Sequence, residues 1–135
     1  MFFEYDITVT KLTTEATAEE TRLPLSKGII NFINVQFPIG CAGLVHCRLE
    51  HHTFPHFPSN PSGNFKSDGF IIPVQGPIKF LSEPHEVNVV AWNEDDSLDH
   101  TITLRFDITE SEPYIRMIKI FEGLAKLLKL AGIKV

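Results

Sequence analysis

The chain has 135 residues, of which 43% are hydrophobic and 21% charged, and its formal net charge is −5. This length fits one domain that can bury a two-layer core without disulfides or metals. Nucleic-acid binding is not expected, because phosphate recognition needs a basic surface. Eleven Phe and nine Pro residues favour strands and turns, so we predict a mostly β fold.

The charge is distributed unevenly along the chain. Residues 1–112 hold seven Lys or Arg residues against sixteen Asp or Glu residues, whereas residues 113–135 hold five against one. The sequence therefore predicts an acidic β-sandwich body, residues 1–112, and a basic C-terminal interaction helix, residues 113–135.

Neither a targeting signal nor a membrane span is expected. Residues 1–4 include no basic residue, and no long apolar run follows them, so we predict no signal peptide and synthesis in the cytoplasm. An uncharged apolar run of about 18 residues, long enough to span a bilayer, does not occur in the sequence.

The first half of the chain alternates between predicted strands and turns. Residues 3–9 alternate apolar and polar side chains, which predicts a strand that pairs with a distant one. Residues 11–20 have almost no apolar side chain and are predicted as a loop or short helical turn across a sheet edge. Residues 29–37 form the next predicted strand, with an inward face made of Ile29, Ile33, Val35 and Phe37.

The two cysteines are predicted to be unpaired. Residues 43–51 form a predicted strand in which Cys47 shares the inward face with Val45 and Leu49. A free thiol packs there as a small hydrophobe. We therefore expect no disulfide between Cys41 and Cys47.

A long loop and two short strands are predicted next. Residues 52–68 are rich in Pro, Ser and Asn, and loops of more than about 12 residues in a compact domain are usually functional or disordered. Residues 70–74 and 78–81 are predicted as short strands on either side of a turn at residues 75–77.

The clearest pattern lies in residues 85–108. Residues 87–92 predict a strand that is buried on both faces. Residues 93–99 are rich in the Asn, Asp and Ser that form turns. The following strand alternates with a period of two, and its inward residues are Ile102, Leu104, Phe106 and Ile108. We predict that the two strands pair as a hairpin. In all, about eight strands with turns every 8–12 residues or so predict an antiparallel β-sandwich of jelly-roll type.

The period then changes to that of a helix. Ser111 and Pro113 form a helix start, and residues 114–131 have helical spacing. One apolar stripe contains Ile115, Ile118, Phe121, Ala125 and Leu128. A second stripe beside it contains Met117, Ile120, Leu124, Leu127 and Leu130. Since a helix with one partner needs a single stripe, we expect the first stripe to dock on the sandwich and the second to remain exposed.

The second stripe is the predicted partner-binding surface. Its residues are Met117, Ile120, Leu124 and Leu127, with Lys119 and Lys126 in the adjoining polar strip. The same helix in other subunits is the predicted partner. Another protein of the same assembly is an alternative, and so is a membrane surface, which a Lys-rich strip would also suit.

Metal binding and catalysis have little support in the residue pattern. Strand alternation sends His46 and His52 to one face and Cys47 and His51 to the other, so these ligands, with His56, do not converge as zinc requires. The oxygen-rich residues 93–99 lack a calcium-loop pattern. No glycine elbow, phosphate loop or paired-carboxylate context is present, and we expect a non-enzymatic protein without cofactors.

Aromatic residues suggest an alternative function. Aromatic faces bind the apolar faces of sugars, and such a platform would be lined by Phe54, Phe57, Phe65, Phe70 and Trp92. The predicted ligand loop consists of Phe54, Phe57, Phe65 and Trp92. The alternative function is therefore a carbohydrate- or small-ligand-binding module. Otherwise these rings cap the ends of the core.

One resemblance bears on function. The segments 27–30 and 37–45, followed by 57–60 and 92–103, resemble small β-sandwich proteins encoded among virus and phage particle genes. The resemblance covers roughly residues 28–108 and carries over no binding residue. It implies a structural, capsid-associated role in a virion or other protein assembly, as a homo-oligomer or with other particle proteins.

Overall fold

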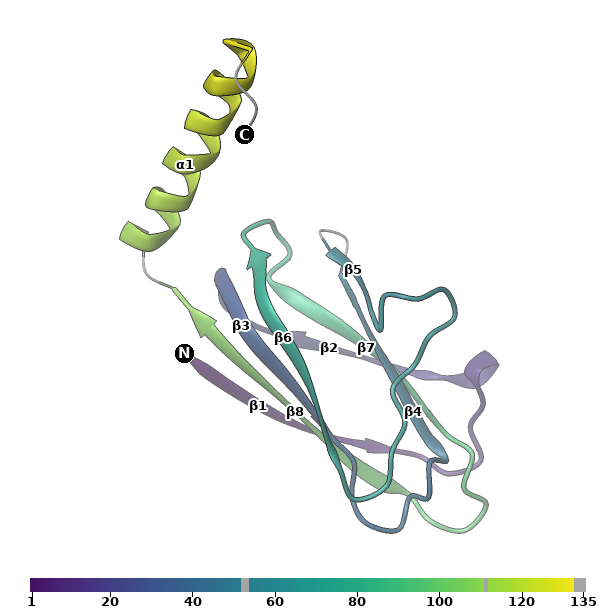
Figure 1. The fold of residues 1–135 in the computed structure, drawn as a ribbon. Coiled ribbons are helices and arrows are strands. Elements are labelled where there is room, and N and C mark those ends of the chain that lie inside the picture. The colour runs from purple at the N-terminus through teal and green to yellow at the C-terminus, as the bar shows by residue number, and fades with distance from the viewer. Residues whose placement is uncertain (52–53, 111, 133–135) are drawn as a thin grey trace.

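The computed structural model describes residues 1–51, 54–110 and 112–132, with the side chains of 54–56 and 112–115 left aside. Two β-sheets and one long helix make up this part of the chain (Figure 1). The strands are β1 (Phe2–Val9), β2 (Glu19–Pro24), β3 (Gly28–Gln36), β4 (Val45–His51), β5 (Phe54–Phe57), β6 (Ile71–Phe80), β7 (Glu86–Asn93) and β8 (His100–Thr109). The helices are the 3₁₀ turn η1 (Glu15–Thr17) and the C-terminal α1 (Glu112–Leu130).

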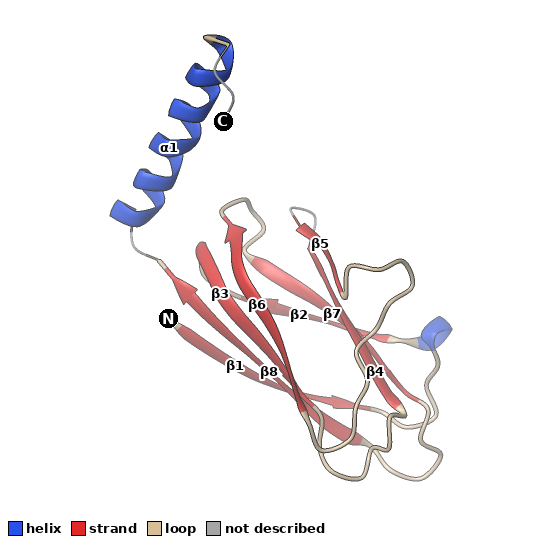
Figure 2. Ribbon diagram, viewed as in Figure 1, coloured by secondary structure: helices blue, strands red, loops and turns tan. Residues whose placement is uncertain are grey.

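The strands form a sandwich of two four-stranded sheets. The strand orders are β1-β8-β3-β6 and β2-β7-β4-β5, and the paired strands are antiparallel. Figure 2 shows the two layers of strands and the single long helix outside them. The prediction of an all-β sandwich with one C-terminal helix is confirmed.

The pairing is nested, as if one long hairpin had been rolled up. β1 pairs with β8, β2 with β7, β3 with β6 and β4 with β5. Two further pairs, β3 with β8 and β4 with β7, complete the sheets. The distant partner predicted for residues 3–9 is thus β8, almost a full chain length away.

The hairpin predicted for residues 85–108 is wrong, because its two strands belong to different sheets. Residues 94–99 cross the roughly 10 Å between packed sheets instead of turning within one. The buried Asn93 stabilises this crossing: its Nδ2 donates to the backbone oxygens of Val9 at 3.1 Å and Leu98 at 3.0 Å. Its Oδ1 accepts from Asp95 N at 3.0 Å. Period-two alternation identifies a strand but does not identify its neighbour.

The turn predicted at residues 75–77 is also wrong, since β6 runs through it as one strand paired with β3. The partner strand adapts through a β-bulge between Ile30 and Phe32. A Cβ at Gly76 would clash with the backbone oxygens of Ile30 and Asn31, so only glycine fits this close approach. Pro77 is tolerated because β6 is an edge strand.

The same bulge changes the predicted inward face of β3. Ile33 and Val35 belong to the core cluster, as predicted. Ile30 belongs to it as well, in place of the predicted Ile29. Ile29 is buried as well, outside that cluster. An extra residue in one strand reverses the alternation on its far side.

The predicted loop at residues 52–68 contains the short strand β5. Beyond it, the backbone of Phe65 exchanges two hydrogen bonds with that of Cys47, so this segment continues along the edge of β4. The inward residues predicted for β4 are confirmed, and both cysteines are free and buried. Burial raises the pKa of the Cys47 thiol to about 12.

The core should be most sensitive at its central aromatic residues. Phe106 of β8 is fully buried between the sheets, so Phe106→Ala should lower the free energy of unfolding by about 3–5 kcal/mol through lost transfer energy and a cavity. Chemical denaturation measures the change. The matched control is Arg105→Ala on the outer face, where the side chain bonds Gln36 and Glu4, and it should cost about 1 kcal/mol or less. A cost for Phe106→Ala as small as the control's would contradict this placement.

Candidate interaction surfaces

The helix α1 presents its apolar residues to solvent. Of the predicted partner-binding residues, Ile120 is 68% exposed, and Met117, Leu124 and Leu127 are exposed as well. The first stripe does not dock on the sandwich as expected: Phe121 is 61% exposed, and Ile118, Ala125 and Leu128 are only partly buried. Figure 1 shows α1 standing beyond the end of β8, away from both sheets. Among the residues whose side chains are described, neither stripe is buried against the sheets, and the second stripe is the more exposed of the two.

The two stripes merge into one broad face of the helix. At 100° per residue, the positions from Met117 to Leu128 that are apolar fill about half of the circumference. The exposed basic residues Arg116, Lys119, Lys126 and Lys129 gather on the other half. The ion pair of Glu122 with Lys79 joins α1 to β6, but both partners are about half exposed, and such pairs contribute only about 0–1 kcal/mol. This one contact does not cover the apolar face.

A second exposed apolar surface lies at the opposite end of the sandwich. Four segments meet there, residues 10–14, 37–44, 66–70 and 94–99, which we call the loop end (Figure 1). Its exposed large apolar residues, with the adjoining Ile71 of β6, are Leu12, Ile39, Phe70, Ile71 and Leu98. Sequence reasoning missed this surface, although apolar residues inside turn-forming segments were a visible signal.

Hydrogen bonds tie the four segments together. Gly40 N donates to Asp68 Oδ1 at 2.8 Å, and Gly69 N donates to Pro38 O at 3.1 Å. On the other side, Lys11 N donates to Asp99 Oδ1 at 2.9 Å. The backbone bonds Leu12 N to Asp95 O and Glu94 N to Leu44 O, each 2.9 Å, complete the network. The exposed residues of the loop end are thus held on connected segments.

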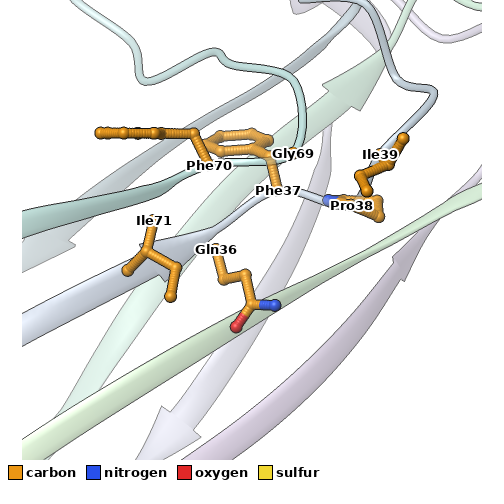
Figure 3. Close-up of a pocket in the computed structure, with 7 residues that line it drawn as sticks. All are labelled: Gln36, Phe37, Pro38, Ile39, Gly69, Phe70 and Ile71. Atoms are coloured by element: carbon orange, nitrogen blue, oxygen red, sulfur yellow. The ribbon is translucent and has the colours of Figure 1, made fainter.

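The loop end contains a shallow apolar pocket of about 380 Å³. Its lining residues are Gln36, Phe37, Pro38, Ile39, Gly69, Phe70 and Ile71. In Figure 3, Phe70 and Ile71 lie on one side of it and Pro38 and Ile39 on the other. Phe37 is buried, whereas Ile39 is 89% exposed, so the pocket joins the core to an open apolar rim.

The loop end is acidic. It contains only two lysines, Lys11 and Lys66, and five carboxylates, Asp68, Glu94, Asp95, Asp96 and Asp99. Asp95 Oδ2 lies 2.7 Å from His100 Nε2, and Asp95 Oδ1 accepts from Ser97 N at 2.8 Å. The bond with His100 and then the one with Ser97 lower the pKa of Asp95 below its ordinary value.

The predicted ligand loop is not assembled as one platform. Residues directly opposite in an antiparallel pair share a face. Trp92 pairs with His46 on the outer face of its sheet, whereas Phe65 pairs with Cys47 and Phe57 with Leu49 on the inner face.

The surroundings of these rings fit packing roles. Trp92 is buried, its ring stacks on that of His46 at 5.0 Å, and Arg48 lies over it at 5.9 Å. Phe57 and Phe65 pack against the core. The side chain of Phe54 lies outside the described residues, and ligand binding stays a prediction.

The histidines of β4 follow the predicted alternation. His46 lies on the outer face, and Cys47 and His51 on the inner face. His51 Nε2 lies 2.8 Å from Pro84 O. The side chains of His52 and His56 lie outside the description. Among the described residues, no group of three or more His, Cys, Asp or Glu side chains is arranged to hold a metal ion.

Comparison of the chain with protein-family models, with curated proteins and with solved structures gives no match. Within the described part of the chain, no helix combines the length and apolar character that crossing a bilayer requires. The exposed face of α1 and the loop end are two surfaces of the described structure that present large apolar side chains to solvent.

The free energy of unfolding should depend on pH through Asp95 of the loop end. Because the pKa of Asp95 is lowered in the folded state, its contribution is complete above about pH 4 and is lost as the pH falls through that lowered pKa. Asp95→Asn should therefore lose less stability than the wild type between about pH 5 and pH 2 in urea denaturation. Asp96→Asn is the matched control, because Asp96 accepts one hydrogen bond from the neighbouring Ser97 hydroxyl. It should lose as much stability in acid as the wild type does. Equal acid losses for Asp95→Asn and the wild type would refute this role.

Proposed function

We propose that this protein is a non-enzymatic structural subunit that self-associates through α1, as a component of a virion or phage particle. The observation that carries the proposal is the apolar half of α1, most of whose large side chains are exposed. A monomeric protein rarely leaves such a contiguous face in water. The function of the helix is then to bind another subunit.

Burial of this face would favour assembly. Burying roughly 300 Å² of apolar surface at about 25 cal/mol per Å² would contribute about 7 kcal/mol before the entropic costs of association. The exposed members of the face are Met117, Ile120, Phe121, Leu124 and Leu127. Their spacing along one helix side suits docking into an apolar groove or pocket.

The strand order supports the jelly-roll interpretation. A jelly roll has eight strands in two sheets and two Greek keys, and it is found in viral capsid proteins among others. The nested pairs from β1 with β8 to β4 with β5 are what rolling up one long hairpin produces. Because one fold serves many functions, the helix and not the sandwich carries the functional argument.

Deletion of residues 114–135 tests the proposal. The body should remain folded and β-rich, because its core is made by the two sheets, and it should lose its assembly. Circular dichroism measures the fold, and light scattering on native protein measures the mass. An unchanged oligomeric mass after the deletion would show that α1 has no part in association.

Two point variants test whether assembly requires the apolar face of α1 and not merely the presence of the helix. Leu124→Glu places a charge in the centre of the exposed face and should weaken assembly without unfolding the body, since the side chain touches no core residue. Gly123→Ala is the matched control on the polar side, where an added Cβ meets nothing within 4 Å. It should favour the helix by up to about 1 kcal/mol and preserve assembly.

A further inference from the structure

We propose that α1 of one subunit docks on the loop end of a second copy of this chain, so that subunits join head to tail. The inference rests on the proposed function, because it names the surface that receives α1. It uses two exposed apolar surfaces that the fold places at opposite ends of one molecule.

The docking helix α1 and the loop end that would receive it lie at opposite ends of one molecule (Figure 1). β8 starts at the loop end with His100 and finishes beside α1 with Thr109, and its ten residues span about 33 Å. α1 is about 28 Å long and points away from the sandwich (Figure 1). In this arrangement α1 does not reach its own loop end. A contact between different surfaces of identical subunits is heterologous, and it generates rings or open filaments.

The apolar parts of the two surfaces are complementary in form. The helix offers a convex row of side chains that includes Ile120, Phe121 and Leu124. The loop end offers the concave pocket beside Ile39 and Phe70, open toward solvent (Figure 3). Docking would cover both sets of exposed side chains in one contact.

The charges are also complementary. α1 holds four basic residues, Arg116, Lys119, Lys126 and Lys129, against Glu112 and Glu122. The loop end holds five carboxylates against two lysines. Opposite potentials favour the encounter of α1 with this end of a neighbour.

Coverage separates this contact from the other two occupants. A bundle of α1 helices joined through their apolar faces, or a lipid surface, would cover α1 but leave Ile39 and Phe70 in water. The second copy accounts for both surfaces.

A mixing experiment on the full chain tests the inference. The helix variant is Ile120→Glu with Leu124→Glu, and the receiver variant is Ile39→Ser with Phe70→Ser. All four side chains are exposed, so neither variant removes core packing. Each variant alone should be monomeric by light scattering, with a dissociation constant raised by roughly 100-fold or more. Mixed in equal amounts, they should form 1:1 dimers and nothing larger, since each retains one working surface.

Phe2→Ser is the matched control for the receiver variant. Phe2 is 56% exposed but lies at the start of β1, away from the loop end, so this variant should assemble as the wild type does. Loss of assembly in Phe2→Ser would overturn the assignment of the receiver.

Other outcomes distinguish the two proposals. If the wild type assembles, the helix variant does not and the receiver variant still does, α1 binds another α1 and only the head-to-tail inference fails. If the wild type is monomeric in solution at every concentration, the proposed function fails as well. Binding of that monomer to phosphatidylglycerol vesicles, lost in the helix variant, would then assign α1 to a lipid surface.

Discussion

The structure depends on the closure of β1 against β8, which joins the two ends of the sandwich chain. Their register runs from Phe2 opposite Asp107 to Val9 opposite His100. This pair places β8 between β1 and β3, so its inward residues, Phe106 among them, pack in the centre of the core. Pairing over such a sequence distance costs conformational entropy. Burial of the inner face of each sheet offsets this cost.

Closure also fixes what lies at each end of the sandwich. Because β8 runs from the loop end to the start of α1, the helix is directed away from the crossing loops. The loop end is held by polar side chains that satisfy buried or crowded backbone groups, as Asn93 does for Val9 and Leu98. Apolar residues such as Ile39 and Leu98 are left outside, since the segments that carry them have no further layer to cover them.

The proposed assembly would cover these exposed residues. The loop end combines exposed apolar side chains with a net negative charge, and α1 combines them with a net positive charge. The proposed contact between these two surfaces would join subunits into an open or closed chain. The strand order of the sandwich is compatible with such a building block and does not by itself require it.

The sequence by itself determined that β1, β3, β4, β7 and β8 are strands and that a helix follows Pro113, because alternation and helical spacing depend only on which side chains must leave water. It also predicted that Met117, Ile120, Leu124 and Leu127 would be exposed. Only the tertiary structure decided which strands are neighbours and where the bulge beside Ile30 shifts the inward face. It also decided that Trp92 lies on the opposite face of its sheet from Phe57 and Phe65. Neighbours are chosen by packing between residues far apart in the chain, and no local pattern records that choice.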